Sequence, residues 1–138
     1  MRKNKGFTLI EMLVVIAIIA VLVAIVIPTV SNATTKAEAA TDAANLRSVL
    51  GYMNTVLITQ EMTIEEATAS YDPPKCKLYP DADLHVLYSY AGFIDVYFVE
   101  GTNYYGLEYF ADIAENGSTE IIPAKPTTEA LDAWYKVG

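Results

Sequence analysis

Residues 12–27 of this 138-residue chain contain no polar side chain, and this run limits the folds that the chain can adopt. The apolar stretch begins earlier, at Phe7, and only Thr8 and Glu11 interrupt it. As a helix, residues 7–27 would be about 30 Å long, which matches the hydrocarbon core of a bilayer. Val and Ile are common here, but a backbone in lipid must satisfy its own hydrogen bonds, so we expect a transmembrane helix.

The segment before the apolar stretch is short and basic. It contains three positive charges and no negative one, at Arg2, Lys3 and Lys5. Positively charged residues stay on the cytoplasmic side of a membrane helix, so this end of the chain is expected in the cytoplasm. The chain after Pro28 would then lie outside the membrane.

Two simple interpretations of this N-terminus are available. A secretory signal peptide would be cut at the small-x-small site of residues 31–33, leaving Thr34 first, but its apolar region is usually about 7–15 residues long. A plain membrane anchor would explain the length and the orientation, but it leaves Glu11 unexplained. A charge at the centre of a bilayer costs about 3 kcal/mol on insertion scales, so we expect Glu11 to have a partner.

The composition argues against several classes of protein. The chain has 17 acidic and 9 basic side chains and a formal net charge of −8, whereas nucleic-acid binders neutralise phosphates with Lys and Arg. Its single cysteine, Cys76, excludes an intramolecular disulfide and a cysteine-rich zinc site. Its single histidine, His85, argues against a catalytic triad and is best explained as a structural residue of a strand. We therefore expect neither an enzyme nor a direct nucleic-acid binder, and no cofactor or metal.

Two smaller features have more than one interpretation. Lys75 and Lys77 flank Cys76 and would favour a reactive thiolate, although an unpaired thiol without function is the simpler interpretation. Asp81 and Asp83 lie close together in a loop and could contribute to a calcium site. Two carboxylates fall short of the roughly 6–8 oxygen ligands that calcium takes, so a solvated turn is favoured.

The start of the apolar stretch resembles the processing motif of type IV prepilins and of the related pseudopilins. The segment reads Gly6-Phe7-Thr8-Leu9-Ile10-Glu11 and follows the short basic leader. The match consists of a glycine before an aromatic residue, a glutamate five positions after that glycine, and the long apolar run. The resemblance covers about residues 1–55, and Pro28 lies where pilin helices commonly have a kinking proline.

This resemblance implies a role for each motif residue. Gly6 would precede the bond that an aspartic prepilin peptidase cuts, and Phe7 would become an N-methylated N-terminus. Glu11 would bind the Phe7 amine of a neighbouring subunit, and this pair would fix the axial register between subunits. The implied partners are the peptidase, a membrane assembly platform with cytoplasmic ATPases, and further copies of the chain.

The implied fold is α+β, with a long N-terminal helix packed on a small antiparallel sheet. We expect a leader at residues 1–6, the membrane and assembly half of the helix at residues 7–30, and a globular domain at residues 31–138. Apolar residues in the second half of the helix alternate spacings of 4 and 3, which predicts one buried stripe. The stripe consists of Ala39, Ala43, Leu46, Leu50, Met53 and Leu57, with Asp42 among the polar residues between them. Pro28 is expected to kink the helix rather than end it.

After the long helix, the pattern predicts a short helix and then strands. Thr63 and Glu66 have the spacing of a capping box, so a helix should run to about Ser70, followed by a loop at residues 72–83. Apolar patterning predicts strands at residues 84–90, 93–100, 103–111 and 120–122. Short turns between them favour an antiparallel meander. The tail from Thr127 is expected to form a short helix, with an edge strand as the alternative.

The resemblance favours a type IV pilin, stored in the cytoplasmic membrane and then polymerised into a surface fibre for adhesion, motility or biofilm formation. A pseudopilin of a type II secretion or competence system shares the same N-terminal motif and is the alternative. An alternative of another class is a membrane-anchored binding domain that never polymerises, which would give Gly6 no role. The lack of a disulfide would suit a Gram-positive lineage.

Overall fold

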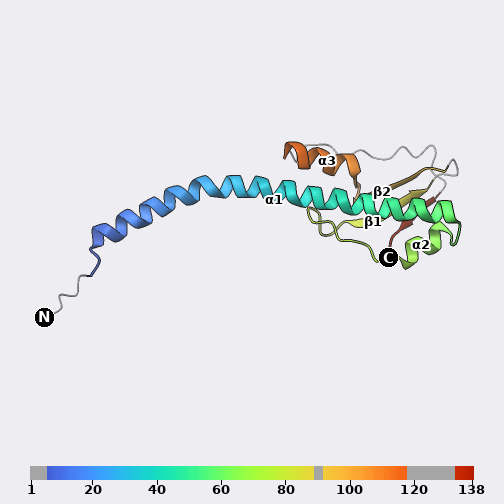
Figure 1. The fold of residues 1–138 in the computed structure, drawn as a ribbon, viewed down its shortest axis with the longest axis horizontal. Helices are drawn as coiled ribbons and strands as arrows, with labels where there is room; N and C mark the ends of the chain where they lie inside the picture. The colour runs from blue at the N-terminus through green and yellow to red at the C-terminus, as the bar shows by residue number, and fades with distance from the viewer. Residues whose placement is uncertain (1–5, 89–91, 118–132) are drawn as a thin grey trace. The chain divides into compact units, whose positions relative to one another are not determined.

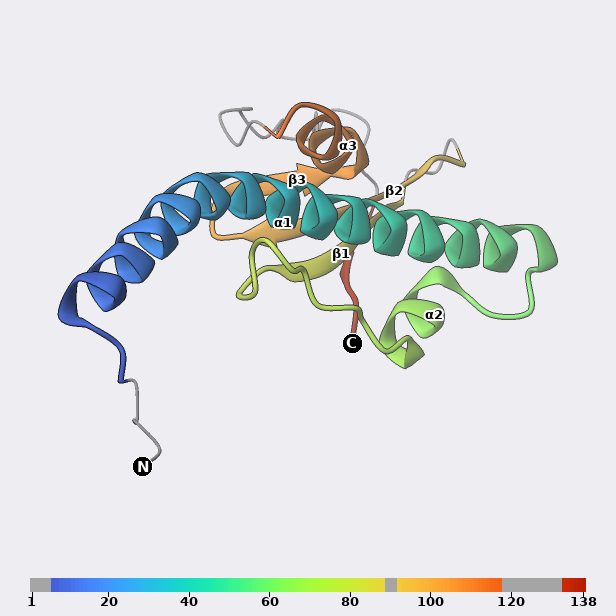
Figure 2. The same cartoon turned by 60° about the vertical axis from the view of Figure 1, so that its left-hand side comes forward.

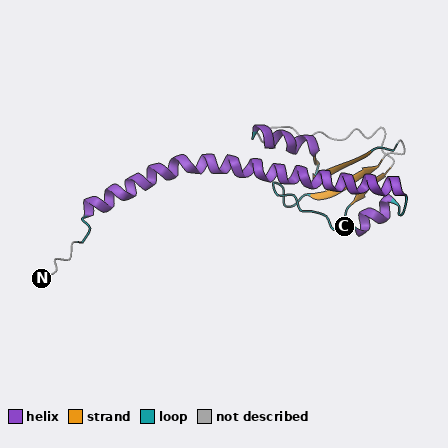
Figure 3. Cartoon of the chain, viewed as in Figure 1, coloured by secondary structure: helices purple, strands orange, loops and turns teal. Residues whose placement is uncertain are grey.

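The computed structural model describes residues 6–88, 92–117 and 133–138. The chain divides into two compact units, Met1–Thr34 and Thr35–Gly138. Its longest element is the helix α1 (Leu9–Thr59), which belongs to both units, and the strands form a four-stranded antiparallel sheet (Figures 1 and 3). The predicted α+β fold, with a long N-terminal helix packed on a small antiparallel sheet, is confirmed.

The first unit consists of the N-terminal part of α1 and the residues just before it. Every residue of this unit that the structure describes is exposed. Among the described residues, α1 is the one helix long and apolar enough to cross a membrane, judged by length and composition. A helix that is apolar on all sides is typical of a membrane span or of a helix buried among others. Pro28 lies within α1, which continues past it, and the expected kink stays a prediction.

In the second unit, α1 buries one stripe of side chains. The buried residues are Ala39, Asp42, Ala43, Leu46, Val49, Met53 and Val56. They recur every three or four residues, as expected for one face of a helix. The stripe lies where the sequence predicts it, but Val49 and Val56 are its buried members whereas Leu50 and Leu57 are only partly buried.

Asp42 is completely buried in this stripe, so placing it among the polar residues between the stripe positions was wrong. Its carboxylate accepts hydrogen bonds from the backbone N–H groups of Lys77 (2.7 Å) and Leu78 (3.0 Å) and from the thiol of Cys76 (3.2 Å). A carboxylate is tolerated in a protein interior where such bonds replace its hydration. Asp42 therefore ties the loop before the sheet to α1 without a covalent bond.

The helix α2 (Ile64–Ser70) begins with the predicted capping box. The Thr63 hydroxyl accepts a hydrogen bond from the backbone N–H of Glu66 (3.2 Å), and the Glu66 carboxylate accepts one from the backbone N–H of Thr63 (2.9 Å). The bonds from the backbone and the hydroxyl of Thr63 lower the pKa of Glu66, because they stabilise its ionised form. The predicted helix and its start are confirmed.

The sheet contains four strands in the spatial order β3-β2-β1-β4. Their bounds are β1 (Asp83–Tyr88), β2 (Ile94–Glu100), β3 (Asn103–Gly106) and β4 (Ala133–Lys136). The first three form the predicted meander, with every neighbouring pair antiparallel. One face of the sheet contributes Leu84, Val86, Val96 and Phe98 to the core that α1 covers (Figure 2).

The third predicted strand is wrong beyond Gly106, because residues 107–116 form the helix α3 (Leu107–Asn116). Tyr109, Phe110 and Ile113 are its buried residues, and their spacing suits one face of a helix better than the alternation of a strand. The helix ends at Gly117, which adopts a left-handed conformation with φ 71° and donates its N–H to the carbonyl of Ile113 (2.6 Å). The predicted strand at residues 120–122 lies outside the described residues.

The C-terminal tail forms the edge strand β4 and not the favoured helix at the positions described. Val86 is opposite Tyr135 in the register between β1 and β4, and Trp134 stacks on His85 with 5.4 Å between ring centroids. The backbone N–H of Val137 extends this pairing by donating to the carbonyl of Leu84. The alternative prediction of an edge strand is correct, because pairing with β1 satisfies backbone groups that a helix would leave at an open sheet edge.

Replacing Asp42 with alanine should release the loop that it holds. Burial, aided by the nearby Asp42 carboxylate, raises the pKa of Cys76 to about 12, so the folded thiol should react slowly with iodoacetamide at pH 8. In Asp42→Ala the N–H groups of Lys77 and Leu78 lose their acceptor, and the free energy of unfolding should fall by about 3 kcal/mol. Labelling of Cys76 in the detergent-solubilised full chain should become at least about tenfold faster.

Asp112→Ala is the matched control for this experiment. Asp112 is an exposed residue of α3, so its loss should leave the labelling rate of Cys76 unchanged. Equal labelling rates in Asp42→Ala and in the unchanged chain would contradict the role of Asp42 in holding the loop.

The raised pKa of Cys76 has a second consequence, because between pH 9 and 12 the unfolded chain loses a thiol proton that the folded chain keeps. The stability of the folded state should therefore decline as the pH rises through that range.

Candidate assembly site at the N-terminus

The first turn of α1 has a capping box that the sequence analysis did not identify. The backbone N–H of Thr8 donates to a carboxylate oxygen of Glu11 (2.9 Å), and the backbone N–H of Glu11 donates to the hydroxyl of Thr8 (3.3 Å). This reciprocal arrangement satisfies two of the N–H groups that a helix start leaves without partners. Thr63 and Glu66 have the same spacing, so the signal was present in the sequence at both places.

The capping box places the Glu11 carboxylate next to the peptide group that follows Phe7. The N–H that this carboxylate accepts belongs to Thr8, the residue after Phe7. A cut after Gly6 would create a positively charged amine on Phe7, one residue from this bond. The positive end of the helix dipole also favours a carboxylate at this position. Glu11 is therefore held where a negative charge can act on a new N-terminus.

Gly6 and Phe7 are accessible to another protein. Phe7 is 81% exposed, and Gly6 is also exposed. A Cβ atom placed on Gly6 would meet no atom within 4 Å. Packing among the described residues therefore gives no reason for a glycine at this position. A narrow binding cleft in a processing enzyme would give one.

Glu11 is the only charged residue between Phe7 and Thr35. The large apolar side chains around it are exposed, Leu9 to 87% and Ile10 to 72%. Exposed apolar surface of this extent must be covered by lipid or by other helices. Wherever that covering excludes water, the Glu11 carboxylate must either take up a proton or gain a positively charged partner.

The other candidate residues do not form a second site. Asp83 pairs with Lys136 (2.7 Å), and the described residues contain no group of three or more side chains that could hold a metal ion. Burial lowers the pKa of His85, which stacks on Trp134 as a structural residue. Cys76 is buried and its pKa is raised, which is the opposite of the reactive-thiol interpretation.

Comparison with known proteins agrees with this geometry. The N-terminal residues 1–27 match a family model described as the prokaryotic N-terminal methylation motif. The match supports a type IV pilin-like or pseudopilin-like protein, a kind that is processed by a prepilin peptidase and handled by an assembly machinery. No curated protein and no solved structure matches the chain. The motif ends within the first unit, so the second unit is described by its fold alone.

The cleavage position can be tested by mass. Protein isolated from the native cell should have the mass of residues 7–138 plus one methyl group. Gly6→Val should leave the full-length chain in the membrane, because a branched side chain would crowd the bond to be cut. Gly51→Val is the matched control, since Gly51 lies in α1 with no atom within 4 Å of an added Cβ, and its product should be cut normally. A mature chain beginning at Thr34 would instead support a signal peptide.

Proposed function

We propose that this chain is the structural subunit of a type IV pilus. The precursor is held in the cytoplasmic membrane by the N-terminal part of α1, cut after Gly6 and methylated at Phe7. Subunits then polymerise into a surface fibre with their apolar helices packed together, leaving residues 31–138 as the globular domain. The matched methylation motif and the exposed apolar helix support this proposal.

The observation that carries the proposal is the single carboxylate in an otherwise uncharged apolar surface. In the separate chain the Glu11 carboxylate accepts the N–H of Thr8 and is exposed to its surroundings. In a fibre, neighbouring helices would replace those surroundings, and an unpaired charge would cost several kcal/mol. The methylated amine of Phe7 in the next subunit supplies the missing charge.

This pairing also determines how the subunits are placed. The apolar side chains of α1 would pack almost equally well at several axial offsets, because dispersion and burial are not directional. The charge pair forms at one offset only. Glu11 thus selects a single register, in the way that one polar residue selects the register of a coiled coil.

The proposed fibre needs other proteins for its formation. A prepilin peptidase cuts the bond after Gly6, and a methyltransferase methylates the new amine of Phe7. An assembly platform with cytoplasmic ATPases then extracts the subunit from the membrane. The chain itself performs no chemistry in this scheme, and its role in adhesion, motility or biofilm formation is mechanical. Labelling of native cells with antibody to residues 31–138 should reveal surface fibres. Cleaved subunits without surface fibres would favour a pseudopilin.

Removing the charge of Glu11 should stop assembly while leaving the helix start intact. Glu11→Gln keeps an oxygen that can accept the N–H of Thr8, so it keeps the capping box and loses only the charge. The number of fibres should fall at least about tenfold, because the amine of the neighbouring subunit is buried without a partner. Glu11→Val should have the same effect, with expression and membrane insertion unchanged. Fibres are counted by electron microscopy, and cleavage is checked by mass.

Thr8→Ala provides the opposite control. This change removes the hydroxyl that accepts the N–H of Glu11 and weakens the helix start by about 1 kcal/mol, but it keeps the charge. Fibre number should therefore stay close to that of the unchanged chain. If Glu11→Gln formed normal fibres and Thr8→Ala did not, the role of Glu11 would be capping and not pairing.

A further inference from the structure

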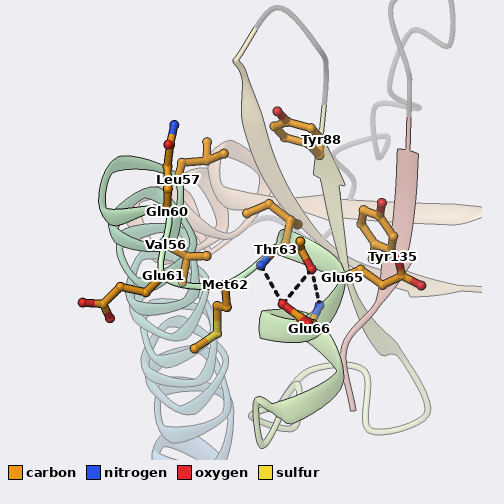
Figure 4. Close-up of a pocket in the computed structure, with 11 residues that line it drawn as sticks. Val56, Leu57, Gln60, Glu61, Met62, Thr63, Glu65, Glu66, Tyr88 and Tyr135 are labelled. Atoms are coloured by element: carbon orange, nitrogen blue, oxygen red, sulfur yellow. Dashed lines mark hydrogen bonds between the residues drawn. The ribbon is translucent and has the colours of Figure 1, made fainter.

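A groove in the second unit is lined by acidic residues. It has a volume of about 630 Å³ and lies between the C-terminal end of α1, the start of α2 and two tyrosines of the sheet, Tyr88 and Tyr135 (Figure 4). The lining includes three carboxylates, Glu61, Glu65 and Glu66, and none of its described residues is basic. Figure 4 shows Glu65 and Glu66 at the start of α2, whereas Glu61 extends outward beyond the end of α1.

Two of these carboxylates have unused binding capacity. Glu66 is engaged in the capping box with Thr63. Glu61 and Glu65 are exposed, and their carboxylates have no hydrogen-bond or ion-pair partner among the residues that the structure describes. Such a groove favours a positively charged occupant over a neutral or negative one.

The loop at residues 75–77 has the complementary charge. Lys75 and Lys77 are exposed, and within the described part of the chain their side chains have no partner. Cys76 between them is buried, and Asp42 binds both its thiol and the backbone N–H of Lys77. The loop therefore presents two positive charges from a backbone that is fixed to α1.

The other described lysines of the second unit already have partners. Lys36 donates to the carbonyl of Glu115 (3.1 Å), and Lys136 pairs with Asp83 (2.7 Å). Arg47 also has no partner among the described residues, but it lies on α1, whereas Lys75 and Lys77 project from a loop. Among the described residues, the loop at residues 75–77 is thus the positively charged segment best suited to enter a groove.

The two features cannot meet within one chain. Asp42, which anchors the loop, and Thr59, where α1 ends beside the groove, are about 25 Å apart along the helix. We propose that the groove receives the loop at residues 75–77 of a second copy of the chain. This inference rests on the proposed fibre, in which copies are held next to one another at high local concentration.

The proposed contact has the symmetry of a fibre. It joins two different surfaces of the same domain, so each copy can give its loop to one neighbour and its groove to another. Contacts of this kind build open helical filaments when the rotation between copies does not close into a ring, as in a fibre. The chain has an excess of acidic residues, so neighbouring globular domains repel each other on average. Meeting points of opposite charge would offset that repulsion where the domains touch.

Charge reversal on each side of the contact tests the proposal. Glu61→Lys with Glu65→Lys should reduce the number of fibres about tenfold, and Lys75→Glu with Lys77→Glu should do the same, because like charges then face each other. A chain that carries all four changes should recover fibres to within about threefold of the unchanged chain, because opposite charges meet again. Glu66 is left unchanged, since it caps α2.

The matched control is Asp112→Lys with Glu115→Lys, which gives the same change in net charge at two exposed positions of α3. These fibres should form normally. In fibres of the unchanged chain, a zero-length carbodiimide cross-linker should join Lys75 or Lys77 to Glu61 or Glu65 of another copy, as identified by mass spectrometry. All variants should be cleaved and expressed alike.

The outcomes separate this contact from the function on which it rests. Normal fibres from either reversal would overturn the contact and leave the pilus proposal standing. The proposed contact would also be overturned if Glu61→Lys with Glu65→Lys lost fibres and the chain with all four changes did not recover them. That result would indicate another cationic partner for the groove. A complete absence of fibres from the unchanged chain would overturn both proposals.

Discussion

The buried stripe of α1 is the surface on which the second unit is built. Leu46, Met53 and the other small and medium-sized residues of this stripe belong to one core with the apolar face of the sheet. The burial of this surface is the main driving force for folding of a domain of this size. The loop at residues 75–77 and α3 are then held to α1 by hydrogen bonds of Asp42 and Lys36.

The apolar residues of α1 are distributed differently in the two units. In the second unit α1 has one apolar side and buries it within its own chain. In the first unit its residues are apolar on all sides, and every described residue is exposed. The surface there can be covered only by lipid or by other chains, so the first unit depends on its environment where the second does not. Glu11 and Thr8 are the polar residues at the start of this helix, and they carry the polar contacts that the apolar residues cannot make.

Much of the fold could be predicted because local patterns and tertiary packing agree. The apolar run, the stripe on α1, the capping box at Thr63 and the first two strands all follow from spacing alone. The third strand was overextended because residues 103–111 contain several aromatic residues, which suit a strand and the buried side of α3 equally well. The tail was assigned to a helix because Leu131, Trp134 and Tyr135 have helical spacing, whereas the open edge of β1 is visible only in three dimensions.

The site residues, too, could be predicted only where a local sequence pattern marks them. The positions of Gly6, Phe7 and Glu11 can be recognised from a local motif, and the capping role of Thr8 could have been found with the rule that identified Thr63. The burial of Asp42 could not, because its partners lie more than thirty positions away and are mostly backbone N–H groups, which every residue has. A charged residue within an apolar stripe is only a weak indication that its side chain is buried and binds a distant loop. Its partners become apparent only when the loop is seen against the helix.

The position of β4 has a consequence for the order in which the second unit folds. The pairs within β1, β2 and β3 join nearby residues, whereas β4 pairs with β1 across a long intervening stretch that includes α3. Closing that larger loop costs more chain entropy, so docking of β4 should follow the formation of the meander. Trp134 is the only tryptophan of the chain, and it stacks on His85 of β1 when β4 is docked. The chain thus contains its own optical probe for the step that completes the sheet.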